Sequence, residues 1–166
     1  DGNMLAISRR VIEAGDPLQG GGSSVIYTAS VNGGELKRLT KQSPSYWHGW
    51  SPDGATLAFV GRRNGDFDIY TIPVNGGEEK QLTATKGLDD GPDYSPDGKY
   101  IYFNSFRTGR MQIWRIDADG QHPVQLTNDK YANWWSYPAP YGKQVAFLSF
   151  IDDQREDHPF GKNVQL

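Results

Sequence analysis

The sequence repeats with a period of about 44 residues, and this repeat restricts the possible folds more than any other feature. The tetrapeptide Ser-Pro-Asp-Gly occurs at Ser51 and again at Ser95, and a degenerate Ala-Pro-Tyr-Gly follows at Ala139, at intervals of 44 residues. A second marker, the dipeptide Leu-Thr, keeps nearly the same spacing and occurs at Leu39, Leu82 and Leu126. One module therefore describes most of the chain.

Each module has the signals of short antiparallel strands. Ser95–Gly98 suits a type I turn, because proline, aspartate and glycine occupy the positions that favour them. Aromatic and β-branched residues then predict strands at Lys99–Ser105 and Met111–Ile116. Asp119-Gly120 is a hairpin signal leading to Val124–Thr127. With an inner strand before the turn, this pattern is typical of a propeller blade.

We therefore predict an all-β fold, a β-propeller of four-stranded antiparallel blades. About four blades are represented, the first and last incomplete, in a single domain with approximate ranges 1–44, 45–88, 89–132 and 133–166. Closed propellers have about four to eight blades, and an open set leaves exposed sheet edges. We expect the missing blades to come from further sequence or from another copy.

Consecutive apolar residues in the second strands predict that both faces of the sheets are covered. Leu57–Val60 and Ile101–Phe103 do not alternate with polar residues, as a half-exposed strand would. The expected core consists of Leu57, Phe59, Ile69, Ile101, Phe103, Ile113, Val145 and Phe147.

The composition suits one soluble domain. The chain has 166 residues, a net charge of −3 and 22% charged residues. There is no apolar run long enough for a membrane span, and no cysteine for a disulfide or a Cys-ligated zinc site. Lys and Arg total 17 against 20 acidic residues, without a basic run, so nucleic acid is not an expected partner.

The repeat resembles the WD-like PD repeat of TolB-type β-propellers. The resemblance rests on S-P-D-G followed by an aromatic strand, then I-Y or I-W, then a D-G or N-G turn and a closing L-T, and it covers nearly the whole chain. It implies a bacterial, periplasmic or secreted protein. Similar repeats occur in the Tol translocation protein, in propeller domains of serine peptidases and in oligogalacturonate lyases, so the fold does not select a function.

In such propellers the loops entering the inner strands and the turns after the second strands lie at the mouth of the central channel. The residues that we predict to contact a ligand there are Trp47, His48, Asp89, Asp90, Arg107, Trp134, Trp135 and His158. Aromatic side chains beside arginine suit a protein, a peptide, an acidic partner or a glycan.

A purely structural interpretation competes with this one. Tryptophans at the start of a blade often pack against the next blade, which we expect for Trp50 and Trp135 more than for Trp47 and Trp134. Arg107 and its expected equivalent Arg62 are explained equally well by hydrogen bonds between blades.

We favour a non-catalytic ligand-binding propeller without a cofactor. Two alternatives stay open. His48 and His158 with nearby carboxylates could hold a divalent metal such as Mn or Ca, as the resemblance to oligogalacturonate lyases implies. The chain could also be the propeller of a prolyl-oligopeptidase-type peptidase whose catalytic domain lies elsewhere, because it has no G-x-S-x-G nucleophile motif of its own.

Overall fold

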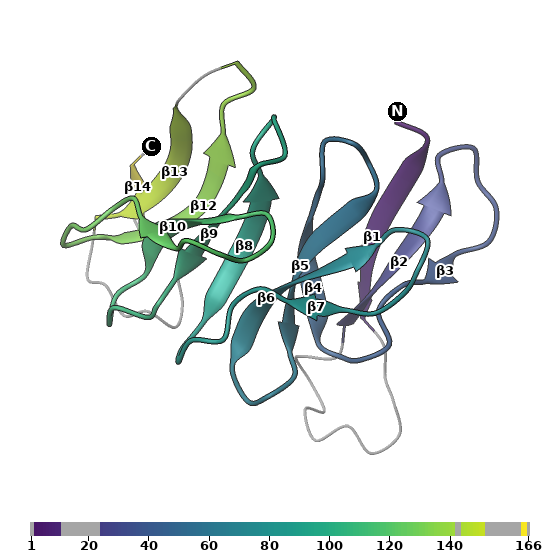
Figure 1. The fold of residues 1–166 in the computed structure, drawn as a ribbon, viewed down its shortest axis with the longest axis horizontal. Coiled ribbons are helices and arrows are strands. Elements are labelled where there is room, and N and C mark those ends of the chain that lie inside the picture. Colours follow the sequence, from purple (N-terminus) through teal and green to yellow (C-terminus); the bar gives the residue numbers. More distant parts are fainter. Residues whose placement is uncertain (1, 11–23, 142–143, 152–163, 166) are drawn as a thin grey trace.

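A computed structural model describes residues 2–10, 24–141, 144–151 and 164–165, and within these ranges the chain forms strands and turns without a helix. Strands make up more than a third of the chain. They form four antiparallel sheets that stand side by side as an incomplete ring (Figure 1).

The sheets follow one another in chain order. The first has the order β1-β2-β3, and its strands are β1 (Met4–Arg10), β2 (Ser24–Ser30) and β3 (Lys37–Arg38). The second and third have four strands each: β4 (Ser45–Trp50), β5 (Thr56–Arg62), β6 (Phe67–Pro73) and β7 (Lys80–Gln81), then β8 (Asp89–Tyr94), β9 (Tyr100–Ser105), β10 (Gln112–Asp117) and β11 (Val124–Gln125). The fourth contains β12 (Ala132–Pro138), β13 (Val145–Phe150) and β14 (Val164–Gln165). The predicted fold class, a propeller of antiparallel blades that does not close, is confirmed.

The Ser-Pro-Asp-Gly turns are held by hydrogen bonds within the tetrapeptide. Ser95 Oγ donates to Asp97 Oδ1 at 2.6 Å, and it accepts the backbone N–H of Tyr100 at 2.9 Å. Gly98 donates its N–H to the Ser95 carbonyl and has a φ of 71°, a conformation that favours glycine. The turn at Ser51 has the same bonds. Each turn therefore joins the first strand of a sheet to the second.

The Leu-Thr marker explains why the last strand of each of the first three sheets is shorter than predicted. Thr40 Oγ1 accepts the N–H of Ile26 at 2.9 Å, and Thr83 and Thr127 make the same bond to the equivalent isoleucines of their sheets. The threonine side chain thus takes a place that a backbone carbonyl would take in a continuing ladder. Regular pairing is therefore limited to two residues in β3, β7 and β11.

The hydrophobic core lies between neighbouring sheets. Phe59 packs with Ile26 between the first two sheets, and Phe103 packs with Val60 between the second and third. Six of the predicted core residues are buried, and they are Leu57, Phe59, Ile69, Ile101, Phe103 and Ile113. Both faces of β5 are thus covered, as the continuous apolar run indicated.

The prediction was wrong for Val145 and Phe147, which are only half-buried. Both lie on β13, whose described partner on the outer side is the two-residue strand β14. That strand pairs only with Ser149 and Phe150. Phe103, at the equivalent position of β9, is paired on its outer side with Trp114 of β10. Among the described residues no further sheet follows the fourth one, so one face of β13 has no sheet stacked on it, unlike the faces of β5 and β9.

Candidate functional site

The first strands of three sheets lie next to one another and share an irregularity. β8 packs against both β4 and β12. Each of these strands changes register with its neighbour, in the segments Tyr46–His48, Asp90–Asp93 and Trp134–Tyr137. Trp47, Gly91 and Trp135 occupy the equivalent places, 44 residues apart, with φ values of 40°, 63° and 49°. Such bulges redirect side chains.

The bulges bring two tryptophans together. The rings of Trp47 and Trp135 stack at a centroid distance of 5.7 Å with an interplanar angle of 13°. A Cβ atom on Gly91 would lie 3.5 Å from Trp135 Cδ1 and 3.7 Å from Trp47 Nε1, so both indoles pass beside this glycine. Trp47 is 40% exposed. We call Trp47 and Trp135 the tryptophan pair.

Buried Asn104 supports this arrangement from β9. Its side-chain oxygen accepts the backbone N–H of Trp135 at 3.2 Å, and its amide donates to the sulfur of Met111. A Cβ atom on Gly91 would approach the Asn104 oxygen to 2.8 Å, closer than a side chain tolerates. Glycine is therefore required at position 91 for two reasons, its positive φ and this close contact.

The arginine at the end of the second strand is held in place by its neighbours. Arg107 Nη2 donates to Asp89 Oδ2 at 3.0 Å, and Asp89 is fully buried. The guanidinium lies 4.6 Å from the Trp114 ring centroid and 5.2 Å from that of Phe103. Asp89 and Arg107 therefore form an ion pair inside the protein, and the ligand contact that we predicted for them stays a prediction.

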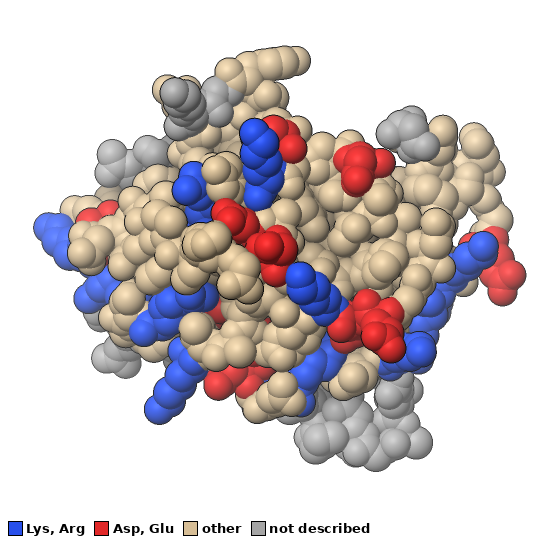
Figure 2. Space-filling model, in the orientation of Figure 1, with Lys and Arg blue, Asp and Glu red and all other residues tan. Residues whose placement is uncertain are grey.

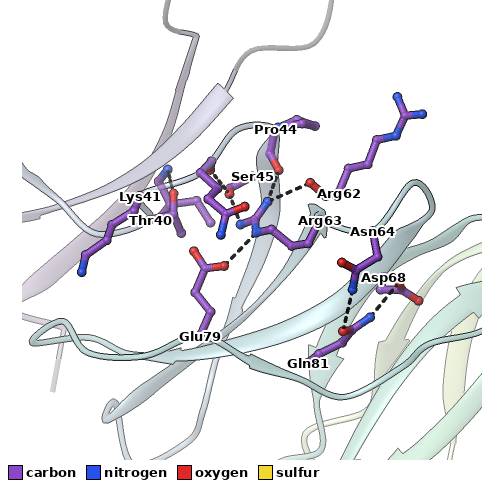
Figure 3. Close-up of polar contacts among 12 residues, drawn as sticks. Thr40, Lys41, Pro44, Ser45, Arg62, Arg63, Asn64, Asp68, Glu79 and Gln81 are labelled. Carbon is purple, nitrogen blue, oxygen red and sulfur yellow. Dashed lines mark hydrogen bonds and ion pairs between the residues drawn. The ribbon is translucent and has the colours of Figure 1, made fainter.

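Arg63, rather than Arg62, is the equivalent of Arg107. Arg63 donates to Ser45 Oγ at 2.7 Å and to Glu79 Oε2 at 2.8 Å (Figure 3). Arg62 is exposed and donates to the carbonyl of Gly65. The predicted equivalence of Arg62 and Arg107 was therefore wrong by one residue. Arg63 and Arg107 do have structural contacts, but these lie within their own blades, whereas we expected hydrogen bonds between blades.

The structure reverses the expected roles of the adjacent tryptophans in β12. Trp134 is buried and clusters with Met111, Ala132 and Phe150, whereas half-buried Trp135 stacks on Trp47. Trp50 is half-buried against the core between the first two sheets.

The side chain of His48, the described histidine on an inner strand, contacts the first sheet. His48 Nε2 is 3.0 Å from the Ala6 carbonyl on β1, and its buried Nδ1 has no hydrogen-bond partner. Burial lowers the pKa of His48. His158 and the stretch Asp152–His158 lie outside the described residues. Within the described residues, no three His, Cys, Asp or Glu side chains gather as a metal site would require.

Carboxylates near the bulge of β8 have raised pKa values. Burial raises the pKa of Asp90 to about 6, although its Oδ1 accepts the Gly91 N–H at 2.6 Å. Burial also raises the pKa of Asp93. Tyr46 has a raised pKa because it is buried and lies near the charge of Asp90. The inner strands thus combine aromatic rings with acids that are partly withdrawn from water.

Asp90 makes the stability of the chain depend on pH. Its folded-state pKa is raised, so the folded state binds the proton more tightly, and the stabilisation is complete below the unfolded pKa of about 3.9. It is lost as pH rises through about 6. We expect Asp90→Asn, which keeps the oxygen that accepts the Gly91 N–H, to raise the free energy of unfolding at pH 7.5 by up to about 2–3 kcal/mol.

Urea unfolding at pH 4.5, 6.0 and 7.5 tests this expectation. The variant should lose part of the decline in stability between pH 4.5 and 7.5. Other buried carboxyls with raised pKa values account for the remainder, among them Asp68, whose pKa is also raised to about 6, and Asp93. Asp66→Asn, at an exposed site, should keep the full decline. An unchanged slope in Asp90→Asn would show that this carboxyl is well solvated in the folded state.

Acidic and basic side chains are interspersed over the face shown in Figure 2, without a single-sign patch across it. No helix among the described residues is long and apolar enough to cross a membrane.

The comparison that decides the family is the match to a family model. The TolB beta propeller domain model matches residues 44–157, which is more than half of the chain. The chain belongs to the TolB β-propeller family. The tryptophan pair of this TolB-family chain therefore lies on inner strands, which line the central channel of a propeller.

Solved structures agree with this assignment. A provisionally named TolB from Agrobacterium tumefaciens has a TM-score of 0.84 and 43% identity, over 99% of this chain and 60% of that one. TolB from Acinetobacter baumannii has a TM-score of 0.69 and 26% identity, over 86% of this chain and 34% of that one. An uncharacterised Agrobacterium fabrum protein is 45% identical over 94 residues, which are 57% of this chain and 29% of the relative. The TolB-family chain thus spans less than two thirds of each of these proteins.

Sequence reasoning missed the stacking of the tryptophans and the roles of Gly91 and Asn104. The signal was the shared spacing, because Trp47, Gly91 and Trp135 are 44 residues apart. Applying the period residue by residue would have placed all three on adjoining strands.

Proposed function

We propose that this chain is part of a non-catalytic binding propeller that holds a segment of a partner protein on the tryptophan pair at its channel. The observation that carries the proposal is the stacking of Trp47 on Trp135, with Trp47 left 40% exposed. Exposed, rigid aromatic rings are favoured anchors at recognition surfaces, because they bury a large area at a small cost in conformational entropy.

The backbone supports a functional origin for the pair. Trp47 and Trp135 have φ values of 40° and 49°, in the left-handed region that costs a non-glycine residue of order 1–3 kcal/mol. Gly91 adopts the same region at the equivalent place without this cost. Tryptophan at a backbone position suited to glycine is expected where the indole ring has a functional role.

The surroundings favour a peptide segment over the other ligands considered. Arg63 and Arg107 are occupied in contacts inside the protein, so they leave the site poorly equipped for an acidic partner. Asp90 and Asp93 add carboxylates that can accept hydrogen bonds from amide or amino groups. TolB family membership fits a protein partner and a periplasmic or secreted location, which are parts of the same proposal.

Truncation of the exposed tryptophan tests the proposal. Peptides selected from a random display library on the wild-type chain should bind Trp47→Ala at least tenfold more weakly, because an aromatic anchor of this kind contributes about 1.4 kcal/mol or more. Isothermal titration with the synthetic peptides gives the dissociation constants. Tyr141→Ala, at a fully exposed tyrosine, is the matched control and should bind normally.

Unfolding curves must show that Trp47→Ala is folded. Peptides that bind wild type and Trp47→Ala equally would contradict the proposal. It would also be contradicted if the library yielded no binding peptide while neutral or acidic oligosaccharides bound the wild-type chain and not the variant.

A further inference from the structure

A cavity of about 400 Å³ lies between the first and second sheets, away from the tryptophan pair. Its walls come from the segment after β3, from β6 and from the approach to β7. The residues that matter for its chemistry are Lys41, Arg63, Tyr70, Ile72, Glu78 and Glu79. A volume of this size is in the range of small-molecule sites.

Two residues that line this cavity each have a buried polar atom without a hydrogen-bond partner among the described residues. The Tyr70 hydroxyl is one of them, on a side chain that is only 3% exposed. The other is Glu79 Oε1, whose sister oxygen Oε2 is bonded to Arg63 (Figure 3). Buried polar groups in proteins are almost always hydrogen-bonded, because an unsatisfied group loses its hydration without compensation, so these two atoms indicate a missing partner.

The repeat does not require these two polar groups. At the positions 44 residues further on, Trp114 stands in place of Tyr70 and Pro123 in place of Glu79. The corresponding arginine, Arg107, takes its carboxylate from the inner strand instead. The phenol and the free carboxylate oxygen are therefore a property of this cavity, rather than a general device for building a blade.

The charges around the cavity balance. Lys41 and Arg63 line the cavity together with Glu78 and Glu79, two positive groups and two negative ones. A bare cation or anion gains little from such a surrounding, whereas a neutral molecule rich in hydroxyl groups can donate to the carboxylate oxygen and exchange hydrogen bonds with the phenol. Ile72 and Leu39 supply apolar wall for the carbon face of such a molecule.

From this geometry we propose that the cavity between the first two sheets binds a neutral polyhydroxylated ligand, of the size of a mono- or disaccharide. Glu79 Oε1 accepts hydrogen bonds from ligand hydroxyl groups, and the Tyr70 hydroxyl donates to the ligand and accepts from it. The Arg63 guanidinium holds Glu79 in place, and through Ser45 it also ties the cavity to the start of β4.

Titration of the chain with glucose, N-acetylglucosamine and maltose tests the proposal, with binding followed by saturation-transfer difference NMR and calorimetry. At least one sugar should bind saturably. Tyr70→Phe, which removes a single oxygen, and Glu79→Gln should each lower the affinity for that sugar at least tenfold. Tyr70→Phe should be as stable as wild type without sugar, because the hydroxyl it removes has no hydrogen-bond partner in the part of the chain that the structure describes.

Trp47→Ala distinguishes this cavity from the channel site, and it should bind the sugar as wild type does. The proposal is overturned if none of the three sugars saturates below roughly 50 mM, a limit that corresponds to about −2 kcal/mol of binding free energy. It is equally overturned if Tyr70→Phe binds with unchanged affinity, or if sugar binding is lost in Trp47→Ala instead.

Discussion

Arg107→Ala should lower the free energy of unfolding by about 3–5 kcal/mol at pH 7.5, because it leaves the Asp89 carboxylate buried without its counter-ion. Asp89 is fully buried, and the side chain of Arg107 is 13% exposed. The guanidinium also packs on the rings of Phe103 and Trp114, so truncation removes contacts as well as charge. Urea unfolding followed by circular dichroism measures the loss.

The chain provides its own control for the charge effect. At the position equivalent to Asp89 the fourth sheet has Asn133, whose side chain donates to Gln112 and accepts from Ser149. Asp89→Asn in the Arg107→Ala background should therefore recover a large part of the lost stability. Arg62→Ala, at the exposed neighbour of the other arginine, should change stability by less than about 0.5 kcal/mol.

Two results would contradict this account. If Arg107→Ala cost less than about 1 kcal/mol, the ion pair would be solvated rather than buried. If the double variant were no more stable than Arg107→Ala, the loss would come from packing and not from the uncompensated charge.

The 44-residue spacing predicted the sheets because it is carried by turn chemistry. Proline, aspartate and glycine in Ser51–Gly54 and Ser95–Gly98 have few alternatives to the turn they form. The strands that follow are continuous apolar runs, and these were correctly predicted to be covered on both faces. Local residue type was sufficient for these features.

The candidate site was harder to predict because its geometry depends on single-residue shifts. In the bulged strand β12, Trp134 is buried and Trp135 joins the tryptophan pair, whereas we expected core packing for Trp135 more than for Trp134. The same kind of shift makes Arg63 rather than Arg62 the partner of the inner strand. A register change of one residue exchanges the faces of a strand, and composition does not reveal it.

Pairs formed between distant residues were also inaccessible to the sequence. Glu79 lies sixteen residues after Arg63 and bonds to it through the fold. Asp89 was expected at the channel mouth, but its charge is turned inward to Arg107. The ligand contacts predicted for the eight channel residues remain predictions, and these residues are Trp47, His48, Asp89, Asp90, Arg107, Trp134, Trp135 and His158.

Phe103→Ala should destabilise the chain by about 3–5 kcal/mol, because it opens a cavity between two sheets. Phe103 is fully buried among residues of both sheets, among them Val60 and Ile69 of the second and Ile101 of its own. Phe59 has the same position between the first two sheets and should respond alike. Thermal and urea unfolding measure the losses.

Phe147 is the matched comparison, since it occupies the equivalent position of β13 and is only half-buried. The central claim is that successive modules fold as sheets whose faces cover one another. The most direct test is to measure the free energies of unfolding of Phe59→Ala, Phe103→Ala and Phe147→Ala side by side on the monomer. We predict similar large losses for the first two and a loss of about 1–2 kcal/mol for the third. Equal losses at all three positions, or a negligible loss for Phe103→Ala, would contradict the stacked-sheet arrangement.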